Sequence, residues 1–512
     1  MSKGGNMEDL DVLVKKLRAK FETQETRGYS WRIAQMQGLR RMIMNHESEF
    51  LDALATDLRK PYMEGLAAET ASMLGSIDYA IKNLKSYMKP QNIQPLALTY
   101  PSKTTVRYEP FGIVLIIGPF NFPFMLTLKP FLGAIMAGNC AVIKMSEYCP
   151  ALTSALKKYF PMYLDTESCK IVEGGVKETE ELLKRQWDFI FFTGSPRVGK
   201  IVAEAAAQHL TPYILELGGK NPVIVDKHVE DLEVVAKRLI WGRCYNSGQI
   251  CLSPEYVLCH EDHVERLISL LAKYIRIFYG ENPQESADFG RMVTKEAANR
   301  VKTLLGDRKN GKIEAGGKVD VEDRYVAPTI LSDADFDSPI MKSETFAPVL
   351  TVNRIKSLDE AVSIVGKVSG KSPLALYVFS SRNSFIEECF SRIQSGGAVA
   401  NDCLLTGVSL ESPFGGLGTS GSGCYHGRFS FESFSHKRTV VQKLFNYNNM
   451  ICDPGLRYPP FSQQKAKWFK WACKNVGILP SVSWKQLAAI SVFLIVSIYP
   501  RGLLSLIRSW IV

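Results

Sequence analysis

The sequence predicts an α/β protein built on parallel sheets, and two observations carry that prediction. Continuous apolar runs of strand length recur, first at 113–117 and again at 141–143, 189–192 and 223–225. Stretches with helical three-to-four spacing separate them. An uninterrupted β-branched run is typical of a strand buried on both faces of a parallel sheet, and alternation of strand with helix favours parallel pairing.

The chain begins with helices. Residues 9–89 place apolar side chains at helical spacing, as at Leu10 and Leu17, and long stretches contain no Gly or Pro. A strand-like segment at 104–108 then leads through a turn at 109–112 into the first buried strand.

A second α/β block runs from about 231 to 399. It includes a helix predicted at 264–277 and a strand at 374–379. A chain of 512 residues is too long for a single core, so two or three domains are expected. No repeat or low-complexity linker marks the boundary between them.

The positive charge lies at the C-terminal end. The span 435–512 holds eleven lysines and arginines and one acidic residue, Asp453, which accounts for the whole net charge of +10. A uniformly basic protein would suggest nucleic acid. A neutral body with a basic tail indicates an anionic membrane surface instead.

The same tail carries an apolar run at 487–499, preceded by lysines interleaved with aromatic residues around Trp468. The run is shorter than the roughly 20 residues of a membrane-spanning helix, and Pro500 and Arg501 interrupt its continuation. Its Lys/Trp flank is of the membrane-interface kind and argues against a core helix. We expect membrane attachment, either spanning the bilayer or lying in one leaflet.

The eleven cysteines are odd in number, form no Cys-x-x-Cys pair and have no metal-ligand spacing to His. This pattern indicates free thiols in a reducing compartment and no metal site. The N-terminus lacks the apolar core of a secretory signal. With the basic flank before the apolar run, we expect the body of the protein to face the cytosol, on the endoplasmic reticulum, the outer mitochondrial membrane or a lipid droplet.

One cysteine has the surroundings of a nucleophile. Cys251 ends the hexapeptide NSGQIC, and Glu216 begins the run ELGGK 35 residues earlier. A thiolate framed by small and amide residues can attack an aldehyde carbonyl, and the adduct can expel hydride. A carboxylate can then activate water to hydrolyse the thioester. An arbitrary cysteine is more often a small buried apolar residue.

A glycine-bearing turn follows the apolar strand at 189–192 and opens a helix. Such a turn presents backbone N–H groups and the positive end of a helix to a phosphate. Its candidate residues are Gly194, Ser195, Val198 and Gly199.

At least six segments between about 106 and 437, in order, resemble motifs of the aldehyde dehydrogenase superfamily. They are PFNFP at 119–123, GNCAVIKMSE at 138–147, FTGSPRVG at 192–199, ELGGK at 216–220, NSGQIC at 246–251 and ETFAP at 344–348. The resemblance implies oxidation of aldehydes to carboxylic acids through a thiohemiacetal and a thioester on Cys251, with Glu216 as the general base. It also implies that the amide of Asn121, with the Cys251 backbone N–H, stabilises the oxyanion.

The resemblance also implies NAD as cofactor. Lys144 and Glu147 would bind the adenosine ribose, and the carboxylate disfavours the 2′-phosphate of NADP, which stays possible. Glu344 and Phe346 would hold the nicotinamide half, and the turn at 194–199 would hold the pyrophosphate.

The class 3 branch, and within it the membrane-bound fatty aldehyde dehydrogenases, resembles this chain most in the position of its cysteine and in segments such as 425–427 and 457–460. This implies long-chain aldehydes as substrates and a homodimer. The alternatives are aromatic or isoprenoid-type aldehydes, a CoA-acylating enzyme, and a non-catalytic membrane-attached scaffold. The expected domains are a Rossmann-like NAD-binding domain at 1–90 and 112–217, an α/β catalytic domain at 218–429, bridging strands for oligomerisation at 91–111 and 430–446, and a basic tail with a membrane anchor at 447–512.

Overall fold

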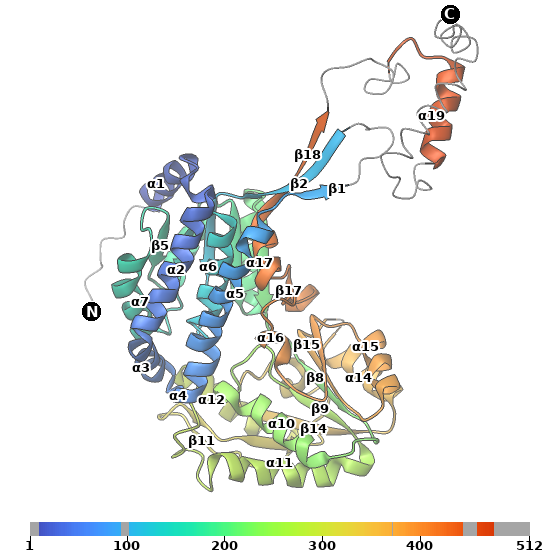
Figure 1. The fold of residues 1–512 in the computed structure, drawn as a ribbon. Coiled ribbons are helices and arrows are strands. Elements are labelled where there is room, and N and C mark those ends of the chain that lie inside the picture. The colour runs from blue at the N-terminus through green and yellow to red at the C-terminus, as the bar shows by residue number, and fades with distance from the viewer. Residues whose placement is uncertain (1–9, 94–101, 371, 444–457, 476–512) are drawn as a thin grey trace, which may run out of the picture. The chain divides into compact units, whose positions relative to one another are not determined.

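The computed structural model describes residues 10–93, 102–370, 372–443 and 458–475 (Figure 1). The chain forms two compact units. One comprises residues up to Lys89 together with Tyr108–Lys437, and the other comprises Pro90–Arg107 together with the residues from Arg438 onward.

The first sheet of the larger unit has six strands in the order β17-β7-β6-β3-β4-β5. Five of them are parallel, and the short β17 pairs antiparallel with β7. The strands are β3 (Ile113–Ile117), β4 (Cys140–Lys144), β5 (Cys169–Val172), β6 (Phe189–Gly194), β7 (Tyr213–Leu217) and β17 (Gly421–Ser422). The predicted parallel α/β sheet is therefore confirmed.

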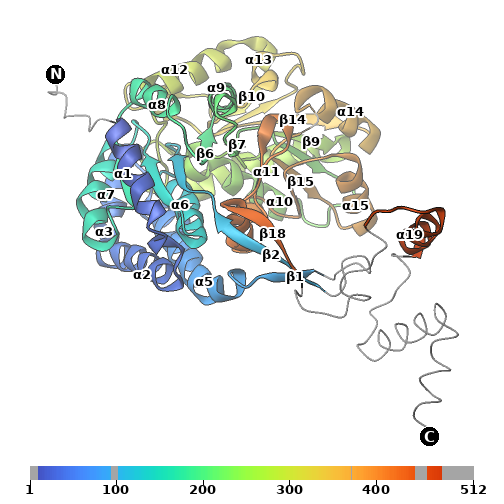
Figure 2. The ribbon, with the colours of Figure 1, turned by 90° about the horizontal axis from the view of Figure 1, so that it is seen from above.

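Helices cover both faces of this sheet. Alternate residues of β3 enter different cores: Val114 and Ile116 pack with α6, whereas Ile113 and Leu115 pack with α1 and α9. Seen from above, α9 lies close to β6 and β7, and α8 lies beside α9 (Figure 2). The helices are α1 (Leu10–Glu22), α2 (Tyr29–Asn45), α3 (Glu47–Leu58), α4 (Tyr62–Gly65), the π-helix η2 (Leu66–Thr70), α5 (Ala71–Tyr87), α6 (Met125–Ala137), α7 (Pro150–Tyr163), α8 (Val176–Leu183) and α9 (Pro196–Gln208).

The second sheet has seven strands in the order β10-β13-β14-β9-β8-β15-β16, parallel except at the β10 edge. They are β8 (Pro222–Val225), β9 (Tyr256–His260), β10 (Lys312–Ala315), β13 (Thr329–Ser332), β14 (Val349–Ile355), β15 (Ala375–Phe379) and β16 (Gly397–Ala400). β11 (Val319–Asp320) and β12 (Tyr325–Val326) form a separate small pair. The accompanying helices are α10 (Leu232–Cys244), α11 (Val264–Tyr279), α12 (Lys295–Gly306), α13 (Pro339–Lys342), α14 (Leu358–Val368), α15 (Asn383–Arg392) and α16 (Leu405–Val408). The helix α17 (Gly427–Ser433) instead packs on α5 and α6, beside the first sheet.

A third sheet of three strands lies within the two segments predicted to carry bridging strands. Its order is β1 (Gln91–Ile93), β2 (Ser102–Pro110) and β18 (Ser435–Lys443). β2 extends through Pro110, so the turn predicted from 109 begins later than expected, at Phe111.

The basic aromatic stretch of the tail forms the helix α19 (Gln463–Asn475). Within the described ranges, no helix combines the length and the apolar character needed to cross a membrane. The apolar run predicted at 487–499 and its continuation lie outside the described residues.

Candidate active site

A cavity of about 550 Å³ lies at the carboxyl ends of β3, β4, β6 and β7. Ligands of open parallel sheets bind at this edge because loops and helix N-termini converge there. Ten of the eleven predicted site residues line the cavity: Asn121, Lys144, Glu147, Gly194, Ser195, Val198, Glu216, Cys251, Glu344 and Phe346.

The eleventh, Gly199, lies behind the cavity wall, where α9 packs on β7. A Cβ at this position would lie 2.7 Å from Leu217 Cδ2. Glycine therefore allows α9 to approach the sheet closely, which brings the N-terminus of the helix to the cavity.

The N-terminus of α9 is built to receive an anion. Ser195 is its N-cap, and its Oγ accepts a hydrogen bond from the Val198 N–H at 3.4 Å. Pro196 occupies the first helical position, and the first turn holds no acidic residue. The helix dipole therefore leaves a positive end facing the cavity.

Lys144 and Glu147 lie together beyond the end of β4. Lys144 Nζ is 2.7 Å from the Met145 carbonyl, to which it donates, and 3.7 Å from Glu147 Oε2. Burial lowers the pKa of Lys144, and Glu147 partly opposes this. The pair can present a donor and an acceptor to a diol.

The turn that carries the nucleophile has an unusual backbone. Asn246, Ser247 and Gly248 have φ of 52°, 53° and 73°. Non-glycine residues in this region carry strain and persist only when their surroundings fix them. Here the Asn246 N–H donates to Glu64 Oε2 at 2.9 Å. The Gln249 side chain donates to the Arg291 carbonyl and accepts from the Val293 N–H.

Gly248→Ala is expected to destabilise the fold by about 2 kcal/mol or more and to reduce activity. The added Cβ would lie 2.3 Å from the carbonyl carbon of Ala347, in a backbone conformation that disfavours L side chains. Chemical denaturation measures the loss. Gly370→Ala is the matched control, because Gly370 has φ of 66° and nothing within 4 Å of its Cβ position. An equal loss in both variants would show that crowding against Ala347 is not the cause.

The Cys251 thiol is held in its neutral form at rest. Burial raises its pKa, and the nearby carboxyl groups of Glu344 and Glu216 raise it further. The backbone amides of Leu252 and Cys251 itself act in the opposite direction. Ionisation therefore needs an additional influence at the moment of reaction.

Glu216 is the buried carboxyl group facing this thiol. It is 3% exposed, and neither of its oxygens has a hydrogen-bond partner among the residues that the structure describes. Burial raises its pKa well above the ordinary value. A carboxyl group kept neutral in this way is a strong base once it ionises.

Asn121 lies in the loop that follows β3, opposite the nucleophile turn. Its side-chain Nδ2 donates to the Gln249 backbone carbonyl at 3.0 Å. The backbone carbonyl of Asn121 accepts from Asn246 Nδ2 at 2.8 Å. An amide NH₂ carries two N–H donors, so one remains for an oxygen at the cavity wall. The structure thus brings Asn121, Glu216 and Cys251 to one cavity.

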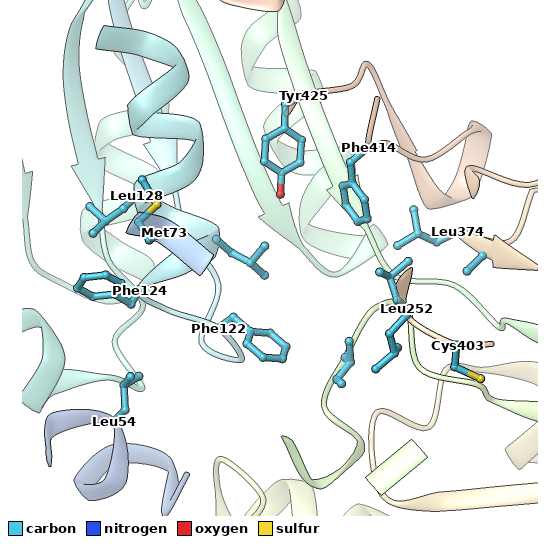
Figure 3. Packing of buried hydrophobic residues seen from close by; sticks show 14 of the residues in the cluster. Leu54, Met73, Phe122, Phe124, Leu128, Leu252, Leu374, Cys403, Phe414 and Tyr425 are labelled. Atoms are coloured by element: carbon cyan, nitrogen blue, oxygen red, sulfur yellow. The ribbon is translucent and has the colours of Figure 1, made fainter. Parts of the chain in front are cut away.

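Apolar side chains support both loops. Phe122 and Phe124 follow Asn121 in the chain, and Leu252 follows Cys251. These three apolar residues belong to one core cluster that also includes Phe414 and Tyr425 (Figure 3). This packing fixes the two loops that carry the polar groups.

Glu344 closes the opposite side of the site. Burial raises its pKa to about 8, and the charge of Glu255 adds to the effect. Its Oε1 has no partner within the described part of the chain. A Cβ on Gly218 would lie 2.0 Å from Glu344 Oε2, so a side chain at Gly218 would displace the Glu344 carboxyl group.

Sequence reasoning missed the buried charges behind the site. Glu255 accepts from Arg243 and Lys220, each at 2.7 Å, and from the Thr345 N–H at 2.9 Å. Burial opposes its ionisation, but Arg243 and Lys220 hold its pKa at about 2. This network anchors the Glu344 loop, and nothing in the local sequence distinguishes Glu255 from a solvated carboxylate.

Known proteins resemble this chain in sequence over most of its length. Residues 2–440 match the model of the aldehyde dehydrogenase family. Human aldehyde dehydrogenase family 3 member B1 is 41% identical over 92% of this chain and 99% of its own length. Rat aldehyde dehydrogenase family 3 member A2 is 40% identical, over 90% of this chain and 93% of its own.

Solved structures of aldehyde dehydrogenases have a similar fold. The substrate-bound state of Staphylococcus aureus AldH has a TM-score of 0.86 and 38% identity, covering 91% of this chain and 99% of that one. The NAD⁺ complex of an aldehyde dehydrogenase from Bacillus cereus has a TM-score of 0.77 and 26% identity, covering 85% and 88%. The expectation of NAD is consistent with what that relative binds.

The two α/β sheets, together with a cavity lined by a cysteine, two carboxyl groups and a helix N-terminus, place the protein among the oxidoreductases. The similarity extends over nearly the whole described chain. The protein belongs to the aldehyde dehydrogenase family, and class 3 members are among its relatives.

Proposed function

We propose that this chain oxidises long-chain fatty aldehydes to carboxylic acids with NAD. The observation that carries the chemistry is the meeting of Cys251, Asn121 and Glu216 at one cavity wall. The long-chain substrate is supported by the resemblance to membrane-bound relatives and by the character of the tail.

The residues present fit a dinucleotide. The α9 N-terminus at Ser195 suits a pyrophosphate, and the Lys144–Glu147 pair suits a ribose diol. The unpartnered Oε1 of Glu344 suits a second ribose hydroxyl. When bound, NAD supplies the acceptor for hydride. A carboxylate at Glu147 favours NAD over NADP.

The protein side chains act in sequence. Cys251 attacks the aldehyde carbonyl as its thiol proton passes to solvent in the cavity, and the carbonyl oxygen of the thiohemiacetal becomes an oxyanion. The remaining N–H of the Asn121 amide and the Cys251 backbone N–H stabilise the oxyanion. After hydride leaves, Glu216 takes a proton from water, which hydrolyses the thioester and releases the acid.

The helix α19 supports a membrane location for this chemistry. Its exposed aromatic side chains Trp468, Phe469 and Trp471 are 39%, 49% and 54% exposed, and lysines accompany them along the helix. Such a surface suits the headgroup region of an anionic bilayer. An enzyme there can collect aldehydes dissolved in lipid, with its catalytic body in the cytosol.

We also propose a homodimer in which the strands near 91–111 and 430–446 bridge subunits. The three-stranded sheet β1-β2-β18 supplies exposed edge strands for that purpose. The proposal includes three membranes to which the tail could attach: the endoplasmic reticulum, the outer mitochondrial membrane and the lipid droplet.

The alternatives differ in what they require. A CoA-acylating enzyme has no need of a hydrolytic base, so the buried Glu216 counts against it. Aromatic or isoprenoid-type aldehydes would use the same catalytic groups. A scaffold without activity would have no use for a cavity lined by all three reacting side chains.

A panel of aldehydes graded by chain length tests substrate and attachment together. We expect saturable NAD reduction with C12–C18 aldehydes, weaker reduction with NADP, and recovery of the full-length chain in the membrane pellet. A chain ending at residue 460 should become soluble and keep its activity towards short aldehydes.

Two outcomes would contradict this. Rapid turnover of small aromatic aldehydes without turnover of long-chain ones would favour the aromatic alternative. Persistence of the shortened chain in the membrane pellet would refute attachment through the tail.

A further inference from the structure

A fully buried ion pair contacts the loop that carries Asn121. Lys60 Nζ and Glu69 Oε1 are 2.5 Å apart, and both side chains are 0% exposed. Burying two charges is costly, and an apolar pair of the same volume is often equally stable. The pair therefore calls for a reason other than stability.

Both members of the pair hold the loop that carries Asn121. Lys60 Nζ donates to the Asn121 carbonyl at 2.9 Å and lies 4.1 Å above the Phe122 ring. Glu69 Oε2 accepts from the backbone N–H groups of Phe124 and Met125 at 3.1 and 2.9 Å. The ion pair therefore binds the backbone of the loop both before and after Phe122.

The backbone around Glu69 is adapted to this contact. Residues Leu66–Thr70 form a π-helix between α4 and α5. A π-turn inserts an extra residue into a helix, rotates the side chains that follow it and is frequent at functional sites. Here it accompanies the inward direction of Glu69.

The helix α4, directly before the π-helix, also contacts the turn that carries Cys251. Glu64 accepts from the Asn246 N–H at 2.9 Å, and Asn246 Nδ2 donates to the Asn121 carbonyl at 2.8 Å. The Asn121 carbonyl therefore receives Lys60 on one side and the nucleophile turn on the other. Residues 60–70 fix two loops that are 125 residues apart in the chain.

We propose that Lys60 and Glu69 are positioning residues that set the Asn121 amide against Cys251. Neither touches the substrate. They act by fixing the carbonyl and the following helix start, so that Asn121 Nδ2 meets the oxyanion in the right direction. This inference rests on the proposed function, in which Asn121 stabilises that oxyanion.

A double-mutant cycle tests it. Asn121→Ala is expected to lower kcat by about 100-fold. Lys60→Met combined with Glu69→Gln removes both charges, retains an acceptor for the two N–H groups, and is expected to lower kcat by about 10-fold with little change in the KM for NAD. In the Asn121→Ala background the same two changes should have almost no further effect.

Arg382→Met is the control, because it breaks another ion pair with a buried partner, Arg382–Asp226, whose atoms are 3.0 Å apart. It should leave kcat unchanged. The thermal midpoint and the rate of Cys251 alkylation by iodoacetamide, measured on every variant, separate a folding defect from a positioning defect.

The outcomes are distinct. If the losses multiply in full, Lys60 and Glu69 act independently of Asn121 and the inference is wrong. The same holds if the charge-free pair has normal kcat. If Asn121→Ala itself is fully active, the oxyanion role in the proposed function fails instead.

Discussion

Cys251→Ala is expected to reduce aldehyde oxidation by on the order of 10⁴-fold or more, because no bond to the substrate can form without the sulfur. The cavity wall and the cofactor residues remain in place, so binding of NAD should be retained. Steady-state NADH formation measures the first effect, and quenching of protein fluorescence on titration with NAD measures the second.

Cys389→Ala is the control for this experiment. Burial raises the pKa of Cys389, as it does for Cys251, but Cys389 lies on α15 in the second core cluster. It should keep its activity. Substantial residual activity in Cys251→Ala would remove Cys251 as the nucleophile. An unchanged cellular role for the inactive chain would favour the scaffold alternative.

Glu216→Gln is expected to stop the enzyme after its first turnover. The amide has nearly the same shape but cannot take a proton from water, so the thioester on Cys251 should accumulate. One equivalent of NADH should form rapidly, followed by a steady rate about 10² to 10⁴ times lower. Stopped-flow absorbance measures the burst, and intact mass measures the acylated chain.

The raised pKa of Glu216 also predicts the direction in which the rate of thioester hydrolysis changes with pH. Burial raises the pKa of Glu216, so the ionised base becomes more abundant as pH rises through that raised value. Hydrolysis of the thioester in the wild type should therefore speed up with increasing pH. The Gln variant should lack this limb of the profile.

Glu344→Gln separates this role from a general effect of removing a buried carboxyl group. Both groups have a raised pKa, but Glu344 is assigned to the cofactor. Its variant should weaken NAD binding and show no burst. If Glu216→Gln is slow already in its first turnover, Glu216 acts before the thioester forms, as the base for Cys251.

The strands that the sequence predicted best are those with uninterrupted apolar runs. β3 was predicted with its observed bounds, and β15 within one residue. β7 escaped because Glu216 interrupts its apolar pattern, although the residue is buried there. Periodicity cannot distinguish a solvated carboxylate from one placed inside for chemistry.

Motif spacing located the groups that touch the cavity but not those that support them. Gly199 was assigned to the cofactor turn, yet it lies behind the wall and serves the packing of α9 on β7. Lys60, Glu69 and Glu255 look like ordinary surface charges in the sequence. Their partners are distant in the chain, and only the tertiary structure brings them together.

The carboxyl group of Glu216, which has no hydrogen-bond partner among the described residues, also affects the stability of the chain. Its pKa in the folded protein is raised above the ordinary value of 4.5, so the folded state binds the proton more tightly than the unfolded state. The contribution of this group is therefore fully present below about pH 4.5 and is lost as pH rises towards the folded value. At neutral pH the contribution of Glu216 to the free energy of folding is therefore less favourable than in acid.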